Sequence, residues 1–165
     1  MEDDCNLDPV KHWPFTWKDF FCKIPYDYDV IQLAIINTIN VYIKLHRRFV
    51  NDFSTACYLI TRHHAQKIIK LHSREDKYKL DNGVKPRAVA DDLIYNSGNT
   101  FSIPLFLYKI ELGSSIHDDH LDNFHRSSHD GIWDFWKNDS TNIEKWDDMF
   151  DYDPYFGTLP PKNEN

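Results

Sequence analysis

Glycine and cysteine are scarce in this chain, and long apolar runs are missing. Only five of the 165 residues are glycine, and neither G-x-x-x-x-G-K-[ST] nor G-x-G-x-x-G occurs, which excludes the usual glycine-rich phosphate loops. Three cysteines without C-x-x-C spacing argue against a disulfide framework or a zinc knuckle. No apolar run approaches the roughly eighteen residues of a membrane span, and no signal-peptide pattern is visible. We therefore expect a cytoplasmic protein, or one of the host cytoplasm if it is viral.

The charge of the chain is negative and comes mostly from aspartate. The formal net charge is −7, with 21 aspartates against 5 glutamates. Nucleic-acid affinity rests on neutralising phosphates with Lys and Arg, so direct nucleic-acid binding is not expected. A basic protein surface suits this charge better as a partner. The sequence does not define an oligomeric state.

Length and composition predict a single all-α domain. A chain of this length with 41% hydrophobic residues supports one ordinary core. The patterns below predict an irregular bundle of about five to seven helices over residues 1–150. An acidic, proline-containing tail over 151–165 is predicted to be extended or disordered.

Apolar residues recur at three- and four-residue spacing over residues 31–53 and again over 56–71, which predicts two buried helices. A break is expected at 51–55, where Asp52, Ser54 and Thr55 offer caps. Near the N-terminus, Thr16 and Asp19 form a capping box for a short helix over 17–23.

Three further segments are predicted to be short elements. A helix beginning at Pro86 and stopping by residue 96 carries Asp91 and Asp92, which a solvated face explains. Residues 101–112 read either as a helix that begins at Pro104 or as a strand, and the helix is favoured. Residues 142–149 form a last amphipathic piece.

The densest group of potential metal ligands spans residues 117–130, with four histidines and four aspartates in fourteen positions. A helix over 116–129, stopped by Gly131, places Asp118, Asp122, His125 and His129 within an arc of about 60°. Such residue types select a divalent metal. The alternative is a solvated polar face without a ligand.

His46 stands directly on the apolar stripe of the predicted helix over 31–53. Such a histidine is either a core residue with one satisfied hydrogen bond or a metal ligand projected into a cleft. Both interpretations stay open on the sequence alone.

The order of these motifs resembles a family of small phage and bacterial helical proteins. That family carries an H-x-x-x-V helix, then H-D-x-S-K, then a late H-x-x-N-x-H-H cluster followed by aromatics. Residues 45–50 are similar to the first motif, residues 75–79 occupy the second, and residues 120–129 with Trp133 and Trp136 resemble the third. The resemblance covers about residues 42–136.

The chain departs from that pattern at three positions. Glu75 and Tyr78 stand where the family has histidine and serine, and Arg126 stands where it has the last histidine. The family's His and Asp pattern suggests a helical relative of the HD phosphohydrolases. The resemblance therefore implies a metal centre that is altered or lost in this chain.

Two classes of function follow. The first is a metal-dependent hydrolase of a phosphate ester or nucleotide, whose bound Mn, Fe, Ni or Zn lowers the pKa of a water molecule. Lys79 or Arg126 would hold the substrate phosphate by charge-assisted hydrogen bonds. The predicted metal ligands are His46, Asp76, Asp118, Asp122, His125 and His129.

The second class is a non-enzymatic acidic interaction protein, such as a viral or phage inhibitor or an immunity protein. Aspartates interleaved with Trp, Tyr and Phe would steer it to a basic site on a host protein and anchor it there.

Overall fold

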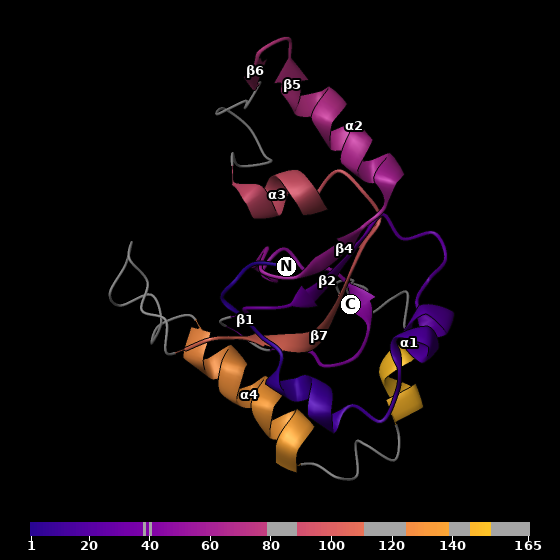
Figure 1. Ribbon diagram of the computed structural model, residues 1–165, viewed down its shortest axis with the longest axis vertical. Coiled ribbons are helices and arrows are strands. Elements are labelled where there is room, and N and C mark those ends of the chain that lie inside the picture. The colour runs from indigo at the N-terminus through magenta and orange to yellow at the C-terminus, as the bar shows by residue number, and fades with distance from the viewer. Residues whose placement is uncertain (38, 40, 79–88, 111–124, 139–145, 153–165) are drawn as a thin grey trace, which may run out of the picture.

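A five-stranded mixed β-sheet forms the centre of the fold, so the all-α prediction is wrong (Figure 1). The computed structural model describes residues 1–37, 39, 41–78, 89–110, 125–138 and 146–152. The strands of this sheet are β1 (Cys5–Asn6), β2 (Val30–Ala34), β3 (His46–Arg47), β4 (Tyr58–Ile60) and β7 (Thr100–Tyr108). A separate hairpin consists of β5 (Ser73–Arg74) and β6 (Lys77–Tyr78).

Helices cover the sheet on two sides. Those described are η1 (Asp8–His12), α1 (Trp17–Lys23), α2 (Arg62–His72), α3 (Ala90–Tyr95), α4 (Arg126–Asn138) and η3 (Trp146–Phe150). In Figure 1, α2 and α3 lie above the sheet, η1 and α4 lie below it, and α1 lies at its right-hand side. The helices therefore belong to a layered α/β architecture.

Strand β2 lies inside the sheet between one parallel and one antiparallel neighbour. It pairs β7 in parallel, with Val30 opposite Thr100, and β4 in antiparallel register, with Val30 opposite Ile60. Along its other edge, β7 pairs β3 near its beginning and β1 near its end. The connection from β2 to β7 carries β3, β4, α2 and α3.

The predicted helix over 31–53 is replaced by β2, β3 and the loops between them. All five residues of β2 are buried, so the strand is covered on both faces and shows little alternation of buried and exposed residues. Isoleucines four residues apart fit a helix face, but β-branched residues also favour strands. Hydrogen bonds to β4 and β7 decide in favour of the strand. Both neighbours are distant in sequence, so the local pattern does not reveal them.

Strand β7 replaces the favoured helix of residues 101–112, and the strand alternative is confirmed as far as Tyr108. Pro104 lies inside it, although proline cannot donate to a ladder. The pairing with β2 shifts register between Ser102 and Phe106, so Pro104 falls in the irregular stretch. Its carbonyl accepts a hydrogen bond from Trp136 Nε1 at 3.2 Å.

Local signals succeed where short-range hydrogen bonds decide the structure. Helix α1 spans the predicted residues, and the Thr16–Asp19 capping box is confirmed. Helix α2 begins at Arg62 instead of residue 56, because Thr61 caps it and β4 occupies the preceding residues. Of the predicted helix over 86–96, residues 90–95 are helical.

Helix α4 continues through Gly131, so the predicted stop at that glycine is wrong. No atom lies within 4 Å of the position that a Cβ at Gly131 would take, so no close contact depends on this glycine. Residues 116–124 of the predicted helix lie outside the described residues. Of the predicted piece over 142–149, residues 146–149 belong to the 3-10 helix η3, and of the tail only residues 151 and 152 are described.

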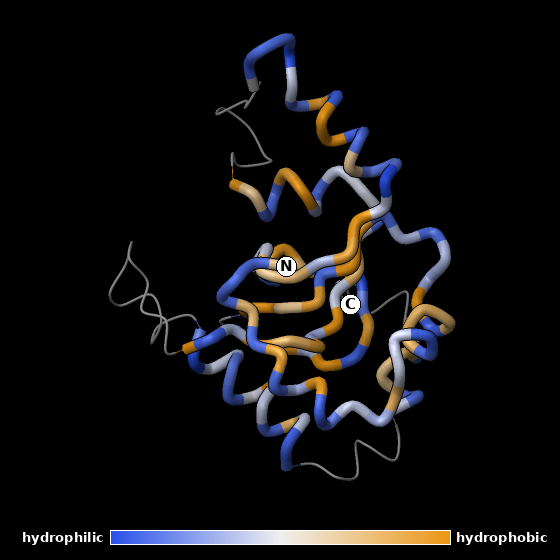
Figure 2. Tube along the Cα trace, in the orientation of Figure 1, coloured by the Kyte–Doolittle hydropathy of each residue, from blue (hydrophilic) through white to orange (hydrophobic). Residues whose placement is uncertain are grey.

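The hydrophobic core lies on the side of the sheet that faces α1, η1, α4 and η3. Phe20, Phe101, Ile103 and Trp136 are almost fully buried there. Figure 2 shows the apolar stretches of the central strands on which this core packs. Within the described ranges, no helix has the length and apolar character that crossing a bilayer requires.

Candidate functional site

The carboxyl ends of β2 and β7 offer the fold's natural place for a ligand. In open α/β sheets, ligands bind in the crevice outside the carboxyl ends of parallel strands. Ala34 of β2 pairs Phe106 of β7, so these two ends lie side by side. The loop that contains Ser54 and the first turn of α3 meet at the same edge.

Ser54 adopts a left-handed backbone conformation, with φ of 108°. Such a conformation costs a non-glycine residue about 1–3 kcal/mol and occurs most often at functional sites. Its N–H donates to Asp91 Oδ1 at 2.5 Å, and its carbonyl accepts from the Tyr95 hydroxyl at 2.6 Å and from Gln32 Nε2 at 2.9 Å. The Tyr108 hydroxyl donates to its Oγ. These contacts from three elements hold the strained residue in place.

The two tyrosines that bond Ser54 are buried donors. Burial is the main cause that raises the pKa of both Tyr95 and Tyr108 above its ordinary value. Both hydroxyls therefore stay protonated at neutral pH and continue to donate.

His46 forms a buried pair with Asp52. His46 Nε2 lies 3.0 Å from Asp52 Oδ2, and Nδ1 lies 2.7 Å from the Lys44 carbonyl oxygen. The Lys44 carbonyl and the Asp52 carboxylate therefore occupy the two ring nitrogens from opposite sides. A metal ion at either nitrogen would have to displace one of these oxygen partners.

Asp52 extends this pair to helix α4. Its Oδ1 accepts from Asn37 Nδ2 at 2.9 Å, and its Oδ2 accepts from the Phe49 N–H at 3.0 Å. The backbone of Asn37 exchanges two hydrogen bonds with the Ser128 hydroxyl, each 2.9 Å long. The network thus fixes the first turn of α4 against the end of β2.

Arg48 is a cation surrounded by carboxylates. Its guanidinium lies over the Tyr95 ring, 4.7 Å from the centroid. Burial lowers the pKa of this guanidinium, while the charges of Asp52, Asp91 and Asp92 oppose that shift. Its Nε and Nη2 are buried without a hydrogen-bond partner among the described residues. One cation among three carboxylates leaves the cluster acidic.

The predicted site residues are dispersed. His125 lies at the candidate edge, with its ring centroid 5.0 Å from that of Tyr108. His129, one turn further along α4, has Nδ1 3.0 Å from Asp130 Oδ1. Asp76 lies exposed in the turn between β5 and β6, at the opposite end of the molecule from α4 (Figure 1).

Of the four remaining predicted site residues, the structure describes only one. Arg126 is the exposed first residue of α4. Lys79, Asp118 and Asp122 lie outside the described residues. In the described part of the chain, no group of three or more His, Cys, Asp or Glu side chains is placed to hold a metal ion.

Sequence reasoning missed the part that α3 plays. Asp91 and Asp92 were explained by a solvated face, yet Asp92 is buried and Asp91 bonds the Ser54 backbone. Two adjacent aspartates in the first turn of a short helix were the available signal. No local signal identifies Ser54, because its partners come from β2, α3 and β7.

No family model, curated protein or solved structure matches this chain. Only the fold therefore defines the class of the protein. It is a protein with a mixed α/β sheet and a polar, partly buried candidate site at the ends of its parallel strands. The resemblance to the phage and bacterial helical family stays a prediction from short motifs.

Proposed function

We propose that the protein is a metal-dependent enzyme that acts on a phosphate ester or a nucleotide at the carboxyl ends of β2 and β7. The observation that carries this proposal is the strained Ser54, held by Asp91 and Tyr108 at the edge where the only parallel strand pair of the described sheet ends. Strain and perturbed buried ionisable groups concentrate at functional sites.

The described residues that flank the His- and Asp-rich segment support the same place. Ile110 lies two residues beyond the end of β7, and His125 packs against Tyr108. The predicted ligands Asp118 and Asp122 lie outside the described residues, in the sequence between Ile110 and His125. His125 and His129 are the described residues that would bind the metal. His46 and Asp76 are not part of this proposal, because one is fully bonded and the other is distant.

A bound Mn, Fe, Ni or Zn ion would lower the pKa of a water molecule and polarise a phosphoryl oxygen. Arg126, at the start of α4, is near enough in sequence to His125 to hold a substrate phosphate, and Lys79 is a second predicted donor. Arg48 holds α3 in place through Tyr95 and Asn96.

Metal titration tests this proposal directly. We expect Mn²⁺ or Zn²⁺ to bind the untagged protein with heat in calorimetry, and a chelator to lower its melting temperature. The variant His125→Ala should bind the metal at least about tenfold more weakly. His63→Ala, which removes an exposed histidine of α2, is the matched control.

Catalysis needs a separate readout. Release of nitrophenol from bis(p-nitrophenyl) phosphate and of phosphate from nucleoside triphosphates should require the metal and fall in His125→Ala. The proposal would be overturned if the purified protein contains no metal and its melting temperature changes neither with chelator nor with added metal.

A second candidate is the acidic interaction protein, and one surface favours it. Trp17 and Phe21 of α1 are 42% and 51% exposed, although their rings are large and apolar. Helix α1 lies beside η3, where Lys23 pairs Asp147 at 3.0 Å, and η3 adds the exposed Asp148. Aromatic anchors beside carboxylates suit a basic partner site.

Salt dependence separates this second candidate from the enzyme. Binding to a basic host protein in a pull-down should weaken as salt rises and should fall in Trp17→Ala. Binding that salt leaves unchanged would count against an electrostatic interaction.

A further inference from the structure

Helix α2 is fixed to α3 at its N-terminal end. Thr61 caps the helix by accepting from the His64 N–H at 3.2 Å, and buried His64 donates from Nε2 to the Ile94 carbonyl at 2.9 Å. Gly98 allows this approach, because a Cβ there would lie 2.4 Å from His64 Cε1. Lys67 adds a hydrogen bond to the Ser97 carbonyl.

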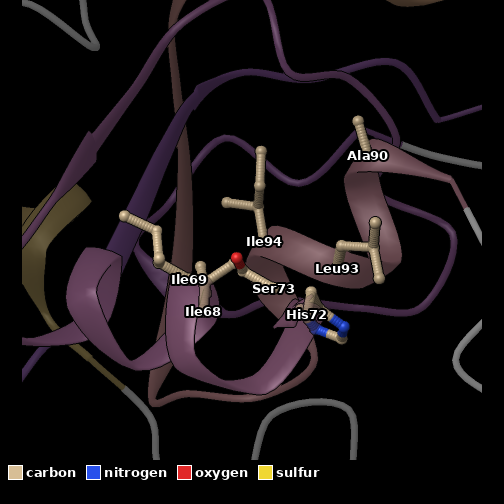
Figure 3. A pocket seen from close by; sticks show the side chains of 7 residues that line it. All are labelled: Ile68, Ile69, His72, Ser73, Ala90, Leu93 and Ile94. Atoms are coloured by element: carbon tan, nitrogen blue, oxygen red, sulfur yellow. The ribbon is translucent and has the colours of Figure 1, made fainter. Parts of the chain in front are cut away.

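Beyond this anchor α2 and α3 diverge, and an apolar groove of about 480 Å³ lies between them (Figures 1 and 3). Figure 3 shows that its walls come from the second half of α2, the residue after it, and α3. The lining residues are Ile68, Ile69, His72, Ser73, Ala90, Leu93 and Ile94. Five of these seven are aliphatic, so the groove suits apolar side chains.

Large apolar side chains around the groove are open to solvent. Ile69 is 64% exposed, Leu71 48% and Val89 43%. Figure 2 shows hydrophobic residues on both α2 and α3, away from the core under the sheet. Of these three, Ile69 lines the groove itself, so exposed apolar surface is present in a concave place, as at interaction sites.

The segment that carries the groove is the basic part of an acidic protein. Residues 62–77, here called the α2 arm, hold five Lys or Arg against two acidic residues, a net charge of +3. The rest of the chain therefore carries −10, given the total of −7. Such an asymmetry selects an anionic partner for the arm.

We propose that the α2 arm and α3 form a docking surface for an acidic amphipathic helix of a partner protein. A groove between two helices receives apolar side chains at i, i+3, i+4 and i+7, as in other helix-in-groove complexes. Helix α2 is about 16 Å long, which matches about three turns of a partner helix. Glutamates or aspartates on the partner's flanks meet the lysines and arginines of the arm.

A lipid surface fits this geometry less well. A helix that lies on a bilayer turns its apolar face outward. In α2, Ile68 faces the groove with Leu93 and Ile94 of α3. The exposed face of α2 carries Arg62, Gln66 and Lys70 beside Ile69, so it is mostly polar and charged.

Fluorescence anisotropy with a labelled synthetic peptide tests the proposal. The probe is a peptide of about twelve residues, with leucines at i, i+3, i+4 and i+7, glutamates on the flanks of this stripe and alanines at the other positions. It should bind saturably, and binding should weaken as salt rises. Ile69→Asp should weaken binding at least about tenfold. Val50→Asp is the matched control, because Val50 is 63% exposed and lies outside the arm.

A second variant tests the positive charge of the α2 arm separately from the apolar contact. Lys70→Glu leaves the groove lining intact and should weaken binding mainly at low salt. Circular dichroism of each variant checks that the helix content of the protein is unchanged. A loss of binding then results from the changed surface and not from unfolding.

Three outcomes would overturn this docking site. The first is equal binding of a peptide with the same composition in scrambled order. The second is binding of anionic phosphatidylserine vesicles but not of the peptide. The third is self-association of the chain that Ile69→Asp abolishes while the peptide does not bind. Neither Ile69 nor Lys70 lies at the proposed metal site, so failure here leaves the proposed function standing.

Discussion

The two faces of the central sheet are held by different kinds of interaction. Neighbouring residues of β2 and β7 show the contrast, because successive side chains of a strand point to opposite faces. Ile31 and Phe101 join the hydrophobic core, whereas Ser102 Oγ donates to Gln32 Oε1 at 3.0 Å on the opposite face. Both faces are buried, but only the second depends on individual hydrogen-bond partners.

This difference predicts how each face responds to substitution. An apolar face loses stability in proportion to the volume removed. A buried polar face loses stability according to how many groups are left without a partner. The polar face also carries the loop with Ser54 and helix α3, so it links stability to the candidate site.

The largest effect is expected for Asp52→Ala. This change removes the partner of His46 Nε2 and the acceptor for Asn37 and the Phe49 N–H, and leaves these buried polar groups unpaired. We expect a loss of about 3–5 kcal/mol in the free energy of unfolding, measured by urea denaturation. The double variant His46→Leu/Asp52→Leu should lose less than the two single changes together. A single-variant loss below about 1 kcal/mol would show that the pair is not desolvated.

A smaller difference is expected between adjacent residues of β2. Gln32→Met keeps the volume but removes the donor to the Phe53 and Ser54 carbonyls and the acceptor of Ser102. We expect a loss of about 1–3 kcal/mol.

Ile31→Val is the matched change on the apolar face and should lose about 0.5–1.5 kcal/mol. If Gln32→Met and Ile31→Val lose the same free energy of unfolding in urea titrations, the proposed contrast between the two faces is wrong.

The contact between α2 and α3 predicts an effect away from both faces. Gly98→Ala places a Cβ 2.4 Å from His64 Cε1 and 2.8 Å from Asp29 Cβ. We expect a loss of about 1–3 kcal/mol in thermal or urea unfolding, because backbone must shift to accept the methyl group. The same change in a His64→Ala background should cost less. An unchanged stability of Gly98→Ala would mean that α2 is not fixed at this point.

The smallest effect is expected at the α1 cap, outside both faces. A side-chain and then a backbone hydrogen bond from Thr16 lower the pKa of Asp19. A lowered folded-state pKa stabilises the protein above the unfolded-state pKa, and this contribution is lost as pH falls through the folded-state pKa. The stability difference between the natural protein and Asp19→Asn should therefore be largest near pH 7 and shrink toward about pH 2. A difference that does not vary with pH would contradict the cap.

Sequence patterns predicted the elements that short-range contacts define. Helix α1 and its capping box were predicted correctly, and so was most of α2, because their hydrogen bonds join residues four or fewer positions apart. The same reasoning failed for β2 and β7. Their isoleucines, leucines and phenylalanines fit a buried helix as well as a buried strand, and their pairing spans about seventy residues.

The candidate site shows the same division. The role of His125 as a metal ligand stays a prediction from its neighbours in the sequence, and only the fold places it beside Tyr108. Ser54 and Asp91 were not predicted, because the first owes its conformation to partners on three elements. His46 was recognised as a histidine among apolar residues, but its partner Asp52 depends on a loop that a continuous helix would not contain.

The sequence by itself determined the acidic charge, the cap of α1, and the basic, amphipathic character of α2, because each depends on residue types within a few positions. The tertiary structure alone decided that residues 30–34 and 100–108 are strands. It also buried Asp92 and placed Asp91 on Ser54. Hydrogen bonds between distant segments choose among local conformations that the chain supports almost equally, and a pattern along the sequence does not contain those partners.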